Sequence, residues 1–187
     1  ELLPQIPEHV GEQLVDGGVG DLDGAGVPAV AEDRRSVGQT SQLLEMVGDL
    51  RDLVGHFEGA CRAYAEVLEV GPDAETRARM HRKRGSVLQR RGDYAEAEAE
   101  LQAAEAALVG VSAELGRVRL WRGRLEHRRG DYARSAELLL EAARIIADSG
   151  GDEADAAEAE DSLAFVHWVR QEIPDARRHW ERTVELR

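Results

Sequence analysis

A three-residue phrase recurs along the second half of the chain. Gly92-Asp93-Tyr94 and Gly130-Asp131-Tyr132 each follow a basic stretch and precede an acidic, alanine-rich one. Weaker copies are Gly55-His56-Phe57 and Gln171-Glu172-Ile173, so the phrase recurs at intervals of about 37, 38 and 41 residues. A period of roughly 20–50 residues is typical of solenoids, whose units stack because none of them buries its apolar face alone. The period therefore predicts a stacked scaffold that presents a surface.

Length, charge and cysteine content exclude several classes of protein. With 187 residues and 4% aromatics, the chain fits one domain of packed helices with a short appendage. It has no apolar run of the roughly 20 residues that span a bilayer, and it has no secretory signal. The net charge of −13 opposes binding to nucleic acid or to an anionic membrane. Cys61 is the only cysteine, which indicates a reducing cytoplasm.

Two further features bear on the origin of the chain. It does not start with methionine, so we expect it to be a piece of a longer protein. Lys83 is the only lysine among 24 basic residues, which indicates a GC-rich bacterial gene.

Residues 1–40 differ in composition from the rest and are expected to form an irregular N-terminal extension. They contain seven glycines and three prolines, which break helices. Short helices are expected around Glu8–Val15 and near Val30–Ser36. The extension is either a linker or edge of the solenoid, or the end of a preceding domain. Residues 41–187 form the predicted repeat domain.

The second helix of each repeat is the clearest helical prediction. Its apolar residues lie at i, i+3 and i+7, a spacing that places them on one side of a helix. The sets are Phe57, Ala60 and Tyr64; Tyr94, Ala97 and Leu101; Ile173, Ala176 and Trp180; in the third unit Tyr132 and Leu139 keep the spacing, with Ser135 in the alanine slot. Asp93 and Asp131 are expected to cap these helices after a glycine turn. Pro72 and the Ser149-Gly150-Gly151 segment mark breaks between units.

These features resemble the tetratricopeptide repeat (TPR), a helix–turn–helix unit of about 34 residues. Units aligned to that pattern begin near Ser41, Ala78, Gly116 and Ala157. Gly48, Gly85, Gly123 and Ala164 take its small position in the first helix; His81, Arg84, Arg119 and Arg122 stand where the repeat usually has an aromatic residue or leucine. The lengthened units are similar to those of STAND-type ATPase regulators and cyclase-linked signalling proteins. The resemblance implies an all-α, right-handed solenoid of about four hairpins.

In this fold the first helices line a concave groove, and the resemblance places a set of basic and aromatic residues there. The predicted groove residues are Arg79, Arg82, Gln89, Arg90, Arg117, Arg124, His127, Arg128, Phe165 and Trp168. Arginine presents a planar fork of donors suited to carboxylate or phosphate. The arginines either bind an acidic ligand, or they pair with the acidic second helices or are simply solvated. Phe165 and Trp168 either anchor a partner or pack against an adjoining helix, and Trp121 and Trp180 are expected in the core.

Catalysis finds little support in the sequence. The six histidines are scattered, and none has a second histidine at i+3 or i+4, so no helical metal site is indicated. Gly17-Gly18-Val19-Gly20 lacks the lysine of a phosphate-binding loop. Cys61 is expected to be a small buried residue. We therefore expect no catalytic residue, metal or cofactor.

The resemblance implies a non-catalytic interaction module, the regulatory part of a larger bacterial signalling or transcriptional protein. Its expected partner is a protein or an acidic peptide segment, held in the groove. Two other functions stay open: sensing of a small molecule, as in STAND-type regulators, and self-association into a homo-oligomer. Charge reversal at Arg82 and Arg124 is expected to abolish binding of an acidic peptide.

Overall fold

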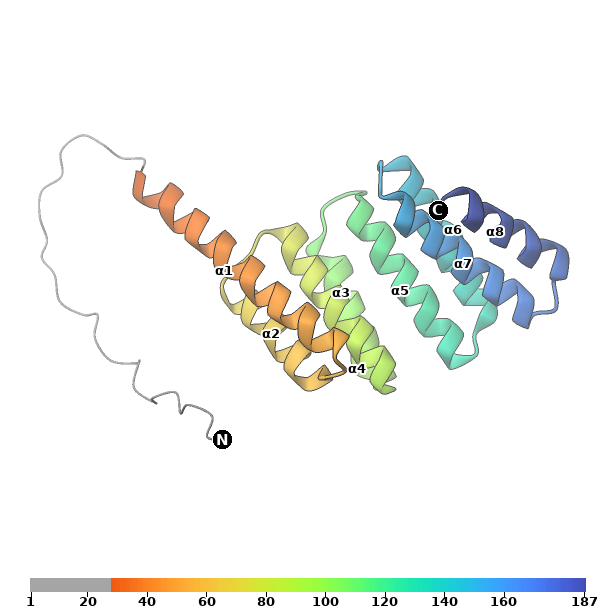
Figure 1. Ribbon diagram of the computed structural model, residues 1–187, viewed down its shortest axis with the longest axis horizontal. Helices are drawn as coiled ribbons and strands as arrows, with labels where there is room; N and C mark the ends of the chain where they lie inside the picture. The colour runs from red at the N-terminus through yellow and green to blue at the C-terminus, as the bar shows by residue number, and fades with distance from the viewer. Residues whose placement is uncertain (1–27) are drawn as a thin grey trace, which may run out of the picture.

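The chain folds as a row of helical hairpins. The computed structural model describes the backbone of residues 28–187 and the side chains from residue 37 onward. Within that range it contains eight α-helices and no strand. They are α1 (Pro28–Leu53), α2 (Phe57–Glu69), α3 (Ala74–Arg91), α4 (Tyr94–Ala107), α5 (Ala113–Arg129), α6 (Tyr132–Asp148), α7 (Glu153–Val169) and α8 (Ile173–Glu185). Figure 1 shows α1, α3, α5 and α7 following one another along the molecule, which confirms the predicted all-α solenoid.

The first helix is longer than the repeat pattern predicts. It begins at Pro28, a residue whose fixed φ suits the first turn of a helix. The helix expected near Val30–Ser36 is therefore part of α1, and α1 crosses the predicted boundary at residue 40. The helix expected around Glu8–Val15 lies outside the described residues.

The recurring phrase forms the tight turn between the two helices of each hairpin. Gly55, Gly92 and Gly130 have φ values of 76°, 93° and 85°, in the left-handed region that glycine enters at low cost. The fourth hairpin makes the same turn with Gln171 at φ 63°, the one non-glycine residue with positive φ in the described chain. The phrase thus marks a backbone conformation, which explains why its weakest copy, at Gln171, still forms the turn.

The expected caps are present at one of the two predicted positions. Asp131 accepts a 2.9 Å hydrogen bond from the amide of Arg134 and caps α6 as predicted. Asp93 occupies the equivalent position before α4 but makes no capping hydrogen bond, so that part of the prediction is wrong. Its carboxylate instead lies 2.9 Å from Nε of Arg91, a pairing that competes for the same oxygen atoms.

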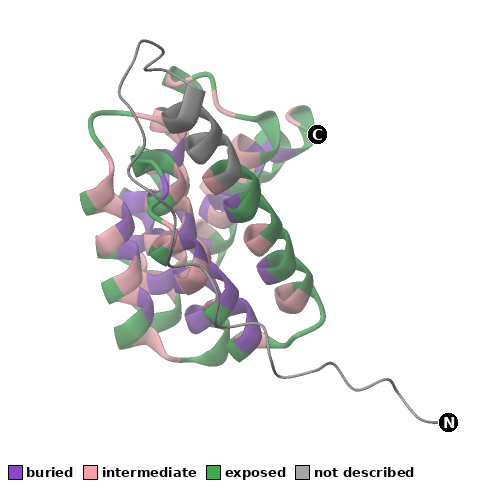
Figure 2. Cartoon of the chain, turned by 90° about the vertical axis from the view of Figure 1, so that its left-hand side faces the viewer, coloured by how far each residue is buried: buried purple, intermediate pink, exposed green. Residues whose placement is uncertain are grey.

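Within each hairpin a glycine of the first helix lets a large side chain of the second approach closely. A Cβ added at Gly85 would lie 2.9 Å from Cγ of Leu101, and one at Gly123 would lie 2.7 Å from Cγ of Leu139. Figure 2 shows the buried residues along the sides of the helices that face one another. The small positions of the repeat are therefore required by packing.

Hairpins contact one another through a second set of apolar residues. Met80 and Val87 of α3 are buried in one cluster with Tyr64 and Val67 of α2. Cys61 packs at the edge of this cluster and is half-buried rather than buried. Burial outweighs the nearby charges, and it raises the pKa of its thiol. Cys61 thus behaves as a packing residue.

The two tryptophans that are predicted to lie in the core differ in their burial. Trp121 is half-buried beside the cluster formed by α3, α4 and α5. Trp180 on α8 is 40% exposed, so its assignment to the core is wrong. The physical reason is position, because α8 packs mainly against α7 and no other described helix covers its opposite side.

No helix in the described part of the chain has both the length and the hydropathy of a membrane span.

Candidate binding groove

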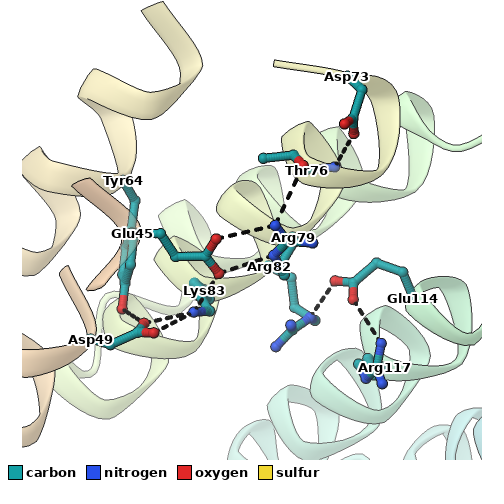
Figure 3. Close-up of polar contacts among 10 residues, drawn as sticks. All are labelled: Glu45, Asp49, Tyr64, Asp73, Thr76, Arg79, Arg82, Lys83, Glu114 and Arg117. Atoms are coloured by element: carbon teal, nitrogen blue, oxygen red, sulfur yellow. Dashed lines mark hydrogen bonds and ion pairs between the residues drawn. The ribbon is translucent and has the colours of Figure 1, made fainter. Parts of the chain in front are cut away.

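The groove face begins with ion pairs that join α1 to α3. Arg79 donates to both carboxylate oxygens of Glu45, at 3.0 and 3.1 Å. Lys83 contacts Glu45 at 2.7 Å and Asp49 at 2.6 Å, and Asp49 also accepts a hydrogen bond from the hydroxyl of Tyr64 (Figure 3). Acids of the first hairpin thus hold bases of the second across the groove surface.

The pairing lowers the pKa of one of these carboxylates. Burial by itself would raise the pKa of Glu45, but hydrogen bonds from Arg79 and Lys83 outweigh it and bring the pKa below its usual value. The same contact, against the opposing effect of burial, raises the pKa of Arg79. Both groups are therefore charged at neutral pH, and the contact is an ion pair.

A buried carboxylate links α3 to α5. Glu114 is 1% exposed and accepts a 2.5 Å hydrogen bond from Nε of Arg82. Its second oxygen accepts one from Arg117 at 3.3 Å, and Arg117 in turn binds Asp155 of α7 at 2.6 Å (Figure 3 shows the first three residues). A chain of charges therefore runs from α3 through α5 to α7.

Further pairs repeat this connection between neighbouring first helices. Arg90 of α3 contacts Asp52 of α1 at 2.5 Å. Arg124 of α5 contacts Glu158 of α7 at 3.1 Å and the Ser162 hydroxyl at 3.0 Å. In each pair the partners are separated by 34 or 38 residues, about one repeat. The groove arginines are thus tied to the neighbouring hairpin.

The acidic second helices serve a different set of bases. Glu105 of α4 is paired with Arg119 and Arg122 of α5, and Glu100 of α4 with Arg84 of α3. The alternative that the second helices pair with the groove arginines is therefore wrong. Five of these arginines pair with acids of the first helices instead, namely Arg79, Arg82, Arg90, Arg117 and Arg124. The arginines that replace the usual aromatic and leucine of the repeat are the ones bound by α4.

A pocket of about 520 Å³ opens between α3, α5 and α7, a size typical of small-molecule and side-chain sites. Its floor is apolar, and its rim carries three arginines and one acid. The lining residues are Gln89, Arg90, Trp121, Arg124, His127, Arg128, Leu139, Asp161, Ser162, Phe165 and Val166. Arg90 and Arg124 are already paired with Asp52 and Glu158, so Arg128 is the rim arginine left to attract an acidic group.

Two polar groups of the pocket lack partners among the described residues. Gln89 is 6% exposed, and its Oε1 atom accepts no hydrogen bond. Nε2 of His127 is also buried without a partner. Burial and then the charge of Arg128 lower the pKa of His127, so its ring is neutral at pH 7. A hydrogen bond from a ligand or a water to such an unpaired buried group is favourable, because it removes the cost of leaving the group unsatisfied.

The pocket rim presents exposed aromatic and cationic side chains. Phe165 is 45% exposed, lies 5.1 Å from the His127 ring and 5.5 Å from the Trp168 ring. Arg128 is exposed and makes no hydrogen bond or ion pair with another described residue. Of the groove arginines, Arg128 is therefore the one whose charge the described structure leaves available.

The predicted groove residues separate into two groups. Gln89, Arg90, Arg124, His127, Arg128 and Phe165 line the pocket. Arg79, Arg82 and Arg117 lie in the ion-pair chain instead. Trp168 does not line the pocket but lies beside Phe165, with the two rings tilted by 36°. Sequence reasoning missed Lys83 and Ser162 as groove residues. The signal that could have found both is a base and an acid or hydroxyl one repeat apart.

A side-chain cluster that the sequence did not predict lies at the turn between α7 and α8. His167, Glu172 and Asp175 have potential ligand atoms within 4.8 Å of one another. Glu172 already lies 2.6 Å from Nδ1 of His167 and 2.9 Å from Arg170, and Asp175 pairs with Arg178. These contacts close the turn as a network of ion pairs, so the geometry gives no preference for a metal.

Comparison with known proteins identifies the fold. The crystal structure of BtubC (BKLC) from P. vanneervenii matches with a TM-score of 0.67, at 17% identity over 84% of this chain and 71% of that chain. MamA 41-end from Desulfovibrio magneticus RS-1 matches with a TM-score of 0.56, at 18% identity over 78% and 75% of the two chains. Both are TPR proteins, which confirms the predicted helical-hairpin repeat. No protein-family model matches the chain, and no curated protein matches its sequence.

Proposed function

We propose that the chain is a non-catalytic interaction module whose groove binds an acidic segment of another protein. The segment places an apolar or aromatic side chain in the pocket between α3, α5 and α7. A carboxylate next to that side chain pairs with Arg128. A polar atom of the segment forms a hydrogen bond with the unpaired atom of Gln89 or His127.

The observation that carries this proposal is the state of the pocket. Its floor contains Leu139 and Val166, its rim holds Phe165 at 45% exposure, and its buried Gln89 amide has an unpaired acceptor. Exposed aromatic residues beside a cation often contribute most of the binding energy at a protein interface. The combination is costly in the unbound chain and becomes favourable when a partner covers it.

The ion-pair chain has a supporting role in this function. Arg79, Arg82 and Arg117 hold neighbouring first helices together, so they set the shape of the groove rather than bind the ligand. Charge reversal at Arg82 would therefore place two acids side by side at Glu114 and disturb the fold. Arg128 is the better position for testing recognition.

A peptide array tests the proposal. It contains Asp- and Glu-rich peptides that carry one phenylalanine or tryptophan, and matched peptides in which the acids are replaced by lysine or the aromatic by serine. We expect the wild type to bind only peptides with both features. The Arg128→Glu and Phe165→Ala variants should no longer bind these peptides. Arg177→Glu on α8 is the matched control, because Arg177 is exposed and lies outside the groove. Binding that is unchanged in both pocket variants would refute the proposal.

The wider context follows from the lengthened repeats. Their resemblance to those of STAND-type regulators supports a regulatory role in a bacterial signalling protein, where occupancy of the groove is passed to an attached domain. The lone Cys61 supports a reducing cytoplasm as the compartment.

A further inference from the structure

Both ends of the row of hairpins carry exposed apolar side chains. At one end they form a stripe on α1, since residues 3, 4, 7, 10 and 11 positions apart share one side of a helix. The stripe consists of Leu43, Met46, Val47, Leu50, Leu53 and Val54. At the other end the exposed residues Ile173, Trp180 and Val184 share one side of α8 in the same way. Solenoids usually end in a polar outer face, and neither of these two faces is polar.

The equivalent residues of the inner repeats show which kind of surface covers such a stripe. The residues at the positions of Leu43 and Leu50 in the next two first helices are each 0% exposed, against 63% and 61% for these two leucines. Those inner residues are Met80 and Val87 of α3, and Val118 and Leu125 of α5. They are covered by the second helix of the preceding hairpin, as the cluster of Met80 and Val87 with α2 shows. The stripe on α1 therefore has the composition of a surface made to contact such a helix.

The face of α8 is the complementary surface. Trp180 takes the position of Tyr64, Leu101 and Leu139, which are at most 1% exposed because they pack between the first helix of their own hairpin and the next hairpin. Trp180 itself is 40% exposed. Each end of the molecule thus presents one half of the interface that joins its own hairpins.

One position along this interface changes in a matched way at both ends. Between α4 and α5 it is an ion pair of Glu105 with Arg122, 2.7 Å apart. In the repeat alignment Val184 of α8 replaces Glu105, and Val47 of α1 replaces Arg122. Valines at both ends would leave an apolar contact at this position between two molecules.

We propose that a second copy of this chain covers these faces, with α1 of one molecule packed against α8 of the next. The contact continues the established interface between hairpins and is heterologous, so it builds an open chain or a ring of molecules. Groove acids on the two sides of the junction are already paired within their own molecules, as Glu45, Asp52 and Asp155 are. Their like charges therefore do not oppose the contact. This inference does not depend on the proposed peptide binding.

Sedimentation equilibrium of the full 187-residue chain tests the proposal through two variants that each block one face. Leu43→Glu/Leu50→Glu blocks the α1 face, and Trp180→Glu/Val184→Glu blocks the α8 face. We expect the mass of the wild type to rise with concentration up to about 1 mM, the range of weak association. Each variant should stay at 20.5 kDa, since each offers only one kind of face. An equimolar mixture of the two should form a dimer of twice this mass and nothing larger.

Two controls keep the result specific. Val111→Glu/Leu140→Glu adds the same charge at exposed apolar residues away from both ends and should assemble like the wild type. Val184→Glu replaces a residue that is mostly exposed and serves as a milder α8 variant if the double change lowers helicity in circular dichroism.

Three outcomes would overturn the inference. A wild type that stays monomeric would show that no second copy covers the faces. An α8 variant that assembles like the wild type would indicate a symmetric contact of α1 with α1. Loss of assembly in the control would show a general effect of charge.

Discussion

Arg82 of α3 donates a 2.5 Å hydrogen bond to Glu114 of α5, a carboxylate that is 1% exposed. This contact joins the two central hairpins beneath the groove. It also explains why a helix so rich in arginine is stable in this position. The groove is therefore a surface whose shape depends on ion pairs between repeats.

Removing one partner of this pair is expected to be costly. Arg82→Met leaves the Glu114 carboxylate buried, with the longer contact to Arg117 as its remaining partner, and should lower the free energy of unfolding by about 3 kcal/mol. The double variant Arg82→Met/Glu114→Leu removes both charges and should be close to the wild type in urea denaturation. Arg177→Met on exposed α8 is the control, with an expected effect of about 0–1 kcal/mol. A double variant as unstable as Arg82→Met would contradict this account.

The glycine of the first helix is expected to be required by the side chain opposite it. An alanine Cβ at position 123 meets Cγ of Leu139 at 2.7 Å, so Gly123→Ala should destabilise the chain by about 1–3 kcal/mol through overpacking. In a Leu139→Ala background the same change should instead stabilise by up to about 1 kcal/mol, the helix propensity of alanine over glycine.

A matched control exists in α1. A Cβ added at Gly38 meets no atom within 4 Å, so Gly38→Ala should raise stability by up to about 1 kcal/mol. Thermal or urea denaturation of the wild type, Gly123→Ala, Leu139→Ala and the double variant forms a double-mutant cycle for the contact. Equal effects of Gly123→Ala in both backgrounds would show that Leu139 is not the cause.

The pH dependence of stability is expected to report on the pocket. Burial and then Arg128 lower the pKa of His127 in the folded chain. As the pH falls, the unfolded chain therefore binds a proton first, near its ordinary pKa of about 6.5, and stability is lost from that pH downward to the folded pKa. Above about pH 6.5 the contribution is fully present.

Comparison with His127→Gln isolates this effect. The other histidines are the same in both proteins, so their contributions cancel in the difference. We expect wild-type stability to fall more steeply than that of His127→Gln between about pH 7 and pH 5. Parallel curves from urea denaturation across this range would show that His127 is not held neutral.

The sequence predicts the features that depend on local chemistry. Gly92 and Gly130 take the positive φ that the turn requires, and Asp131 caps α6 because glycine–aspartate at a helix start is a strong local signal. The spacing of Phe57 and Tyr64 places both residues against one hydrophobic cluster. These features recur in each unit, so the repeats reinforce one another as evidence.

Features that depend on the neighbours of a helix are harder to predict from the sequence. Trp180 has the spacing of a core residue, but it is 40% exposed because α8 packs mainly against α7. Gly38 suggested irregular chain, yet α1 continues through it because a single glycine costs a helix only about 1 kcal/mol. The pairs that cross the groove, such as Arg90 with Asp52, depend on the register between hairpins, which composition does not fix.

The most direct test of the proposed function is NMR of the labelled chain with the tightest-binding acidic aromatic peptide from the array. The account predicts that the side-chain signals of Gln89 and His127 shift in step with peptide concentration, since these unpaired groups line the pocket. The signals of Trp180 on α8 should stay in place. Shifts confined to α8 or to the stripe on α1, with Gln89 and His127 unchanged, would show that the pocket is not where the partner binds.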